Sequence, residues 1–262
     1  MKAMFKALYL LAGLVLAGLV LVGLVLVGLA LASPGASAAT PCRDIAFEGV
    51  SYTLCDVSLN DDLRLFHSGS DGLLGSFDAI EDALAQSGEQ LGFAMNAGMY
   101  HPDRAPVGLL VQNGQPQSRL ITSDGPGNFG LLPNGVFCVG KTFGVIESRE
   151  YARTNPACTY ASQSGPMLVI DGALHPKFLA ASASKFIRNG VGVSADGAQA
   201  VFAISNDPVN FHAFARLFRD ALALPDALYF DGKISRLYAP GLGRDDFGFS
   251  MGPIVGTVIP KG

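Results

Sequence analysis

Six apolar segments of the chain begin or end at short loops that combine glycine with polar side chains. Runs rich in β-branched and aromatic residues favour strands, and folded scaffolds commonly present binding and catalytic groups on the loops at strand ends. The polar residues at these six positions are Asn96, Asn134, Ser164, Arg188, Asn206 and Asp231. We therefore expect a functional site assembled from several strand-end loops.

These loops also have a purely structural explanation. Asn-Gly, Asp-Gly and Ser-Gly pairs form turns without any further function. Turn formation does not account for the Tyr, Arg and Ser side chains that accompany them, such as Tyr100, Arg188 and Ser235. Six such loops in one chain therefore favour a binding or catalytic site over turns alone.

Several well-known catalytic signatures are missing from the sequence. It contains no phosphate-binding Gly-x-x-x-x-Gly-Lys-Ser/Thr loop, no His-Glu-x-x-His motif and no Gly-x-Ser-x-Gly elbow. The histidines His67, His101, His175 and His212 share no ligand spacing, and no Cys-x-x-Cys pair occurs. A nucleotide triphosphatase, a zinc protease or a serine esterase of those types is therefore not expected.

The order of the loop motifs resembles that of the phosphodiester glycosidase family, and most closely that of its exported bacterial members. The similarity runs over residues 62–259. The matching pieces are Asn96-x-Gly98-x-Tyr100, Asn134-Gly135, Ser164-Gly165-Pro166, Arg188 with Gly192, and Asp231-Gly232 with Ser235. At the last motif Lys233 and Ile234 stand where the family often has two glycines.

The resemblance implies hydrolysis of a sugar-1-phosphodiester at the sugar–oxygen bond, which yields a free sugar and a phosphomonoester. A phosphate leaving group is a weak base, so little general-acid help is needed. The site needs a carboxylate near the anomeric carbon, and cationic or N–H donors for the phosphate. Asp231 is the candidate carboxylate, as a nucleophile or as the base for water, and Arg188 is the candidate phosphate ligand because its planar fork can bind two oxygens.

Further residues are assigned on the same basis. Asn96 joins Asp231 as a catalytic candidate, and Tyr100 is expected to stack on a sugar face. The remaining substrate-binding candidates are Ser164, Asn134, Asn206, Ser235 and Arg236. Asp171 and Asp207 are alternative partner carboxylates, although both lie in sequences typical of turns.

This interpretation requires no cofactor, and a divalent cation held by Asp231 and Asn oxygens stays an open alternative. Two other functions also stay open. The Lys233-Ile234 segment favours a non-catalytic module that binds envelope glycan or a partner protein, and a phosphodiesterase that cuts the other P–O bond would need metal.

The first part of the chain differs from the rest. Lys2 and Lys6 precede an apolar run over residues 8–32, and Ala36-Ser37-Ala38 follows a Pro/Gly break. This pattern predicts a secretory signal over residues 1–38, cleaved after Ala38. The run is also long enough for an uncleaved membrane anchor. We therefore expect a periplasmic or secreted domain over residues 39–262, which contacts the membrane only through the N-terminal segment and only if that segment is not cleaved.

The charge balance excludes one class of partner. The 262 residues carry 18 Lys+Arg and 22 Asp+Glu, and loss of two Lys with residues 1–38 leaves 16 against 22, a net charge of −6. Such an acidic chain is not expected to bind nucleic acid. The expected partner is a sugar-phosphate diester or an envelope glycan, such as exopolysaccharide.

All four cysteines lie in the exported part, and an even number in an oxidising compartment indicates two disulfides. Three pairings are possible from sequence alone. The pairing Cys42–Cys55 with Cys138–Cys158 closes the shortest loops, and we predict it for that reason.

The secondary-structure pattern predicts an α+β fold in one domain, with a mainly antiparallel or mixed sheet and a few packed helices. One helix is expected between the N-cap residue Ser76 and Gly88, and an amphipathic helix over residues 210–223. Strands are expected over residues 45–57, 63–67, 91–95, 107–111, 136–139, 142–146, 167–170, 191–194, 200–204, 228–230 and 254–259.

Overall fold

The structure is a computed structural model that describes residues 41–70 and 72–262. The predicted signal or anchor over residues 1–38 lies outside the described residues. Within the described ranges, no helix is both long enough and apolar enough to cross a bilayer. Residues 41–262 belong to one compact unit, and they form the α+β domain that the sequence predicts.

The largest sheet has seven strands in the order β1-β2-β15-β14-β16-β12-β13, and every pairing in it is antiparallel. Its strands are β1 (Cys42–Phe47), β2 (Val50–Ser58), β12 (Met167–Ile170), β13 (Ala173–Leu174), β14 (Asn189–Val193), β15 (Gln199–Ser205) and β16 (Asp226–Asp231). The antiparallel pairing of β14 with β16 places the first residue of β14 beside the last residue of β16, with Asn189 opposite Asp231.

Two five-stranded antiparallel sheets complete the scaffold. One has the order β10-β9-β11-β7-β8 and the other β18-β17-β6-β19-β3. Their strands are β3 (Asp62–Phe66), β6 (Glu89–Asn96), β7 (Leu110–Gln112), β8 (Gln115–Pro116), β9 (Gly135–Val139), β10 (Phe143–Glu147), β11 (Tyr160–Ser164), β17 (Leu237–Ala239), β18 (Arg244–Asp245) and β19 (Ile254–Pro260). Strands β4 (Ser68–Gly69) and β5 (Gly72–Leu73) form a small separate ribbon.

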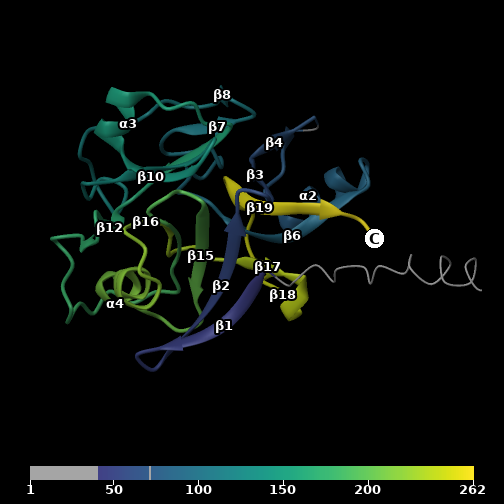
Figure 1. The fold of residues 1–262 in the computed structure, drawn as a ribbon. Coiled ribbons are helices and arrows are strands. Elements are labelled where there is room, and N and C mark those ends of the chain that lie inside the picture. Colours follow the sequence, from purple (N-terminus) through teal and green to yellow (C-terminus); the bar gives the residue numbers. More distant parts are fainter. Residues whose placement is uncertain (1–40, 71) are drawn as a thin grey trace, which may run out of the picture. The chain divides into compact units, whose positions relative to one another are not determined.

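Short helices cover the outer sheet faces (Figure 1). Helix α2 (Phe77–Ala85) begins at Ser76, whose hydroxyl accepts a hydrogen bond from the Ala79 N–H, as the N-cap prediction requires. Helix α3 (Ser148–Thr154) lies beside β9 and β10, and was not predicted. Helix α4 (Phe211–Arg216) packs on the seven-stranded sheet and continues into a π-helical turn, Leu217–Ala221.

The three sheets meet in a common apolar core. Four of its phenylalanines come from all three sheets: Phe137 lies on β9, Phe93 on β6, and Phe202 and Phe230 on β15 and β16 of the seven-stranded sheet. The ring centroids of Phe137 and Phe202 are 5.5 Å apart, and those of Phe93 and Phe202 are 5.3 Å apart. Aromatic pairs at such distances stabilise a protein beyond the burial of their apolar area. This cluster therefore helps to hold the three sheets in their relative positions.

One predicted strand is wrong in its extent. Residues 45–57 form parts of two strands, β1 and β2, because the chain turns back at Glu48 and Gly49 with positive φ angles of 50° and 76°. Glycine tolerates this backbone region, which makes the turn feasible. The other predicted strands and both predicted helices are present, with ends that differ by a few residues.

The predicted disulfide pairing is confirmed. Cys42 bonds to Cys55 across the β1–β2 hairpin, and Cys138 on β9 bonds to Cys158. The described residues contain no free cysteine.

Replacing Cys42 and Cys55 together by alanine should lower the free energy of unfolding by about 2 kcal/mol, because the unfolded chain regains the freedom of the 13-residue loop. The hairpin keeps its backbone ladder, so the loss should lie near the lower end for disulfides. Urea unfolding at pH 7 measures it, and an unchanged midpoint would show that the crosslink adds nothing to stability.

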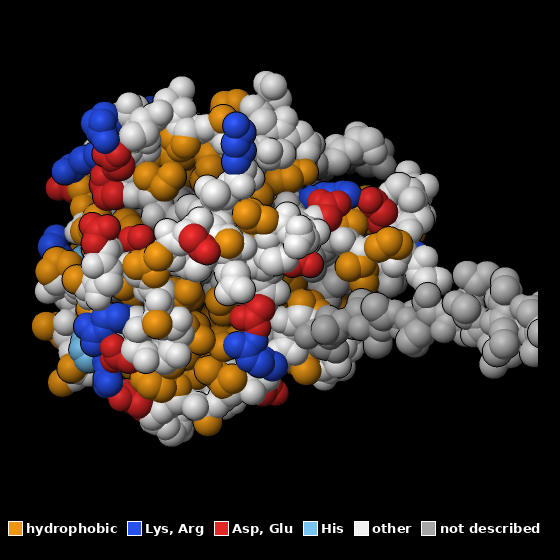
Figure 2. Space-filling model, in the orientation of Figure 1, with side chains coloured by type: hydrophobic (Ala, Val, Ile, Leu, Met, Phe, Trp, Pro, Cys, Tyr) orange, Lys and Arg blue, Asp and Glu red, His pale blue; other side chains and the backbone are white. Residues whose placement is uncertain are grey.

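Acidic and basic side chains are interspersed on the face of the molecule shown in Figure 2. Ion pairs at the surface include Arg216 with Glu48 and with Asp220, and Arg64 with Asp62. These arginines therefore form ion pairs with acidic neighbours and do not form a basic patch.

Candidate active site

A cleft of about 600 Å³ opens where the end of β16 meets three loops. Its walls come from the loop after β6, from residues 126–129, from Phe186 and from the segment that follows β16. Tyr229, Asp231 and Gly232 line it at the end of β16, and Tyr100 lines it from the loop after β6. The cleft therefore lies at strand ends, where the sequence pattern predicts a site.

Asp231 ends β16 and exposes its carboxyl group to the cleft. Its Oδ1 accepts hydrogen bonds from the backbone N–H groups of Gly232 at 2.6 Å and Lys233 at 2.9 Å. Burial raises the pKa of this carboxyl group, while these N–H donors and the Lys233 ammonium partly oppose the shift. Asp231 is thus a partly desolvated carboxylate in a fixed orientation, which suits a nucleophile or a base.

Arg188 comes directly before β14 and is 1% exposed. Its Nε donates to the Val209 carbonyl at 2.8 Å, and its Nη2 donates to the Ser184 carbonyl at 3.1 Å. The guanidinium carbon lies 3.7 Å from the ring centroid of Phe211. Because β14 runs antiparallel to β16, this cation lies beside the loop that begins at Asp231.

The amides of Asn96 and Asn189 join two sheets directly behind Asp231. Asn96 Nδ2 donates to Asn189 Oδ1 at 3.2 Å, and Asn189 Nδ2 donates to the backbone carbonyl of Asn96 at 2.7 Å. Asn189 Oδ1 also accepts a hydrogen bond from the Asp231 N–H at 3.1 Å. The Asn96–Asn189 pair therefore fixes the position of the Asp231 backbone at the start of the loop after β16.

The amide group of Asn96 is used by the protein itself. It donates to the Ile234 carbonyl at 2.7 Å and accepts from the Arg236 N–H at 2.9 Å, and Asn96 is fully buried. Through these hydrogen bonds the Asn96 side chain holds the loop that follows β16. We therefore interpret Asn96 as a positioning residue and not as a group that touches substrate.

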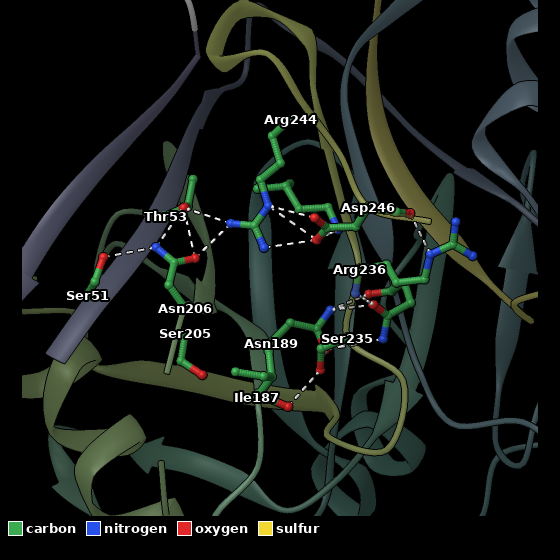
Figure 3. Close-up of polar contacts among 12 residues, drawn as sticks. Ser51, Thr53, Ile187, Asn189, Ser205, Asn206, Ser235, Arg236, Arg244 and Asp246 are labelled. Carbon is green, nitrogen blue, oxygen red and sulfur yellow. Dashed lines mark hydrogen bonds and ion pairs between the residues drawn. The ribbon is translucent and has the colours of Figure 1, made fainter. Parts of the chain in front are cut away.

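Ser235 and Arg236 close the same loop (Figure 3). The Ser235 hydroxyl lies 2.9 Å from the Asp231 carbonyl and 3.0 Å from the Ile187 carbonyl. Arg236 Nε donates to the Asp246 carbonyl at 2.7 Å, and Nη1 donates to the Phe249 carbonyl at 2.8 Å. Both side chains therefore donate hydrogen bonds to backbone carbonyl groups near the cleft.

Tyr100 faces the cleft, and its hydroxyl donates to the Ser250 carbonyl at 3.3 Å. Burial, and to a smaller extent the negative charge of Asp231, raise the pKa of this hydroxyl to about 12, against opposing effects of Arg236 and Arg104. The two side chains thus influence each other across the cleft, and the Tyr100 ring is available for a contact with a sugar.

Of the predicted binding residues, Tyr100 lines the cleft, whereas Arg188, Ser235, Arg236, Ser164, Asn134 and Asn206 do not. Ser164 is buried and donates to the Phe230 carbonyl at 2.9 Å. Asn134 donates to the Phe129 carbonyl at 3.0 Å and so holds a residue that does line the cleft. Asn206 lies in a separate polar cluster with Ser51, Thr53 and Arg244, as Figure 3 shows.

The alternative carboxylates also lie elsewhere. Asp171 is an exposed turn residue with a φ of 47°. Asp207 is exposed, and its Oδ2 accepts a hydrogen bond from the Ser51 N–H. Among residues 41–70 and 72–262, no group of three or more His, Cys, Asp and Glu side chains is arranged to hold a metal ion.

The sequence interpretation missed Asn189 and Tyr229. Asn189 follows Arg188 directly within the predicted Arg188–Gly192 motif, and this place in the motif was the signal from which Asn189 could have been predicted. Tyr229 lies in the apolar run before Asp231, two residues away on the same strand face. That spacing was the available signal for a second polar group pointing the same way.

The chain belongs to the phosphodiester glycosidase family, whose family model matches residues 89–245. That range includes the whole of β6, the whole of β14 and the Asp231 loop. The family resemblance of the loop motifs is therefore confirmed.

The chain is also similar to two individual proteins. It is 40% identical to the uncharacterized protein YigE of Escherichia coli strain K12 over 153 residues, which are 58% of this chain and 59% of YigE. The chain thus matches less than two thirds of that relative's length. The catalytic domain of zebrafish N-acetylglucosamine-1-phosphodiester alpha-N-acetylglucosaminidase, solved in a form auto-inhibited by its pro-peptide, has the same fold, with a TM-score of 0.56 at 12% identity over 82% of this chain and 81% of that one.

Proposed function

We propose that the protein hydrolyses the glycosidic C–O bond of a sugar-1-phosphodiester and releases a free sugar and a phosphomonoester. The observation that carries this proposal is the meeting of a desolvated carboxyl group and a buried guanidinium at one strand end. Asp231 ends β16, and Arg188 comes directly before the adjacent antiparallel strand β14. Both lie beside Gly232, which lines the cleft together with Asp231. Membership of the family supports the same reaction.

The chemistry follows from the charges of these two groups. The bond between the anomeric carbon and the bridging oxygen breaks, and its electron pair stays on the phosphate oxygen. A cation near the phosphate stabilises that developing charge. The Asp231 carboxylate stabilises the positive charge that develops on the sugar, either by bonding to the anomeric carbon or by taking a proton from the attacking water. Water supplies the hydroxyl of the free sugar and the proton of the phosphomonoester.

The direct test is incubation of the purified protein with a synthetic N-acetylglucosamine-1-phosphodiester in water enriched in oxygen-18. Equal amounts of reducing sugar and phosphomonoester are expected, with the heavy oxygen in the sugar. Heavy oxygen in the phosphate would instead identify a phosphodiesterase that cuts a P–O bond. Glycan binding without any turnover would identify a non-catalytic module.

The activity should depend on pH through Asp231. The ionised carboxylate is the active form in either role, and burial raises its pKa above the ordinary value of 3.8. The ratio kcat/KM should therefore rise with pH through an apparent pKa above 3.8 and then level off. A profile that stays flat down to pH 3.8 would exclude an ionised Asp231 from the rate-determining step.

The same proposal includes export of the domain over residues 39–262. Two disulfides support an oxidising compartment, and the apolar leader with Ala36-Ser37-Ala38 supports a cleaved signal. The substrate would then be an envelope or exopolysaccharide phosphodiester. N-terminal sequencing of the protein recovered from its cell fraction should give Ala39 as the first residue, whereas an intact Met1 would indicate a membrane anchor.

A further inference from the structure

Arg188 is a buried cation without an acidic partner. None of the ion pairs among the described residues includes it. Two of its nitrogens are used by backbone carbonyls, but Nη1 has no hydrogen-bond partner within residues 41–70 and 72–262. A buried charged donor left unpaired costs free energy, so this N–H is the part of Arg188 that an anionic ligand can satisfy.

Aromatic rings set the direction of that free N–H. The guanidinium lies over the ring of Phe211 at 3.7 Å, with Tyr229 and Phe186 at 5.3 and 5.5 Å. Cation–π contacts stabilise the charge without using an N–H donor. The ring of Tyr229 packs edge-on against Phe211, with centroids 4.7 Å apart and planes at 84°. This cage holds Arg188 and Tyr229 as one unit.

Gly232 brings the Tyr229 hydroxyl and Arg188 Nη1 to the same point of the cleft wall. A Cβ atom at position 232 would lie 2.2 Å from the Tyr229 hydroxyl and 3.4 Å from Arg188 Nη1. Only glycine leaves room for the Tyr229 hydroxyl at this point. Tyr229 and Gly232 both line the cleft, beside Asp231.

We propose that the Tyr229 hydroxyl and Arg188 Nη1 together form a subsite that binds the phosphoryl group, at the point of the cleft wall where Gly232 leaves room for the Tyr229 hydroxyl. This inference rests on the proposed function and adds Tyr229 to its machinery. The phenol donates its proton to one phosphate oxygen, and Nη1 donates to a second. Such donors stabilise the negative charge left on the phosphate when the sugar–oxygen bond breaks.

The environment keeps the phenol in the form that donates. Burial raises the pKa of the Tyr229 hydroxyl, and the charge of Asp231 raises it too, against opposing effects of Arg188 and of the Asn128 side chain. The phenol therefore stays protonated at neutral pH. The subsite carries one positive charge from Arg188 next to the negative Asp231, which suits an anion whose other end must lie against that carboxylate.

The experiment measures binding of phenyl phosphate to the folded exported domain by calorimetry, with inorganic phosphate as a second probe. Tyr229→Phe removes the hydroxyl but keeps the ring against Phe211, and should weaken phenyl phosphate binding about tenfold. Arg188→Met should weaken it about a hundredfold or more. Tyr160→Phe is the matched control, because its hydroxyl bonds to Asn113 Oδ1 outside the cleft lining, and it should bind like the wild type.

A third variant tests the geometry. Gly232→Ala should displace the Tyr229 hydroxyl and reduce binding at least as much as Tyr229→Phe. Thermal unfolding followed by circular dichroism identifies any variant that has lost its fold. If Gly232→Ala fails to fold, the Tyr229→Phe and Tyr160→Phe comparison still decides the question.

The outcomes separate this subsite from the proposed function. Weakened binding in folded Tyr229→Phe together with a wild type that does not turn over any sugar phosphodiester would keep the anion subsite and reject the glycosidase. Unchanged binding in Tyr229→Phe would overturn the role of Tyr229 even if the wild type is active. A wild type that binds neither probe at millimolar concentration would overturn the subsite as a whole.

Discussion

Asp231→Asn is expected to lower kcat/KM on a sugar-1-phosphodiester by about a thousandfold or more. Asparagine keeps the size of the side chain and can still accept the hydrogen bonds from the Gly232 and Lys233 N–H groups. It cannot carry the negative charge that stabilises the sugar cation or that attacks it. The loss should therefore appear in kcat, with little change in the affinity for phenyl phosphate.

Stability should move in the opposite direction. The pKa of Asp231 is raised in the folded protein, so its contribution to stability is present at low pH and is lost as pH rises through the folded pKa. At neutral pH the charged carboxylate thus disfavours folding, and Asp231→Asn should unfold at the same or a higher urea concentration than the wild type. An inactive variant that is also unfolded would not support the proposed role.

Asp171→Asn is the matched control for this experiment. Asp171-Gly172 and Asp231-Gly232 are the same dipeptide at the end of an apolar strand, β12 and β16. Asp171 lies in an exposed turn outside the cleft lining, and asparagine tolerates its positive φ. Activity should be unchanged in Asp171→Asn, and equal activity in both variants would remove Asp231 from catalysis.

This pair of aspartates also shows how far the sequence determines the site. Local pattern predicts a strand followed by an Asp-Gly turn at both positions, and the structure has both. What distinguishes them is the tertiary surrounding of Asp231, which includes Asn189 from β14 and Asn96 from a different sheet. Contacts between sheets depend on how the core packs, and no short-range pattern encodes them.

The fold was more predictable than the site for a related reason. Strand periodicity, the Ser76 cap and the short disulfide loops are local signals, and each gave a correct element or pairing. The error at residues 45–57 came from overlooking Glu48-Gly49 as a turn. Ser164 lies at the strand end that the sequence predicts, but its side chain does not point into the cleft. Its hydroxyl donates a hydrogen bond to a backbone carbonyl inside the protein.

The largest expected loss of stability among these variants follows from Asn189→Ala. Asn189 makes two donor bonds to Asn96 and accepts from Asn96, Asp231 and Ser235. Alanine would leave the buried amide of Asn96 and the N–H of Asp231 without these partners. Each unsatisfied buried group costs about 1–3 kcal/mol, so the free energy of unfolding should fall by about 3–4 kcal/mol.

Activity should also fall in Asn189→Ala, because the Asp231 loop loses the contact that fixes its first residue. The fall should appear mainly in kcat, with phenyl phosphate binding changed far less than in Arg188→Met. Asn206→Ala is the matched control, since Asn206 also makes several side-chain hydrogen bonds but is exposed. Its expected loss is below about 1 kcal/mol, because water can replace its partners. Equal destabilisation by the two substitutions would show that the Asn96–Asn189 pair has no special role in joining the sheets behind the cleft.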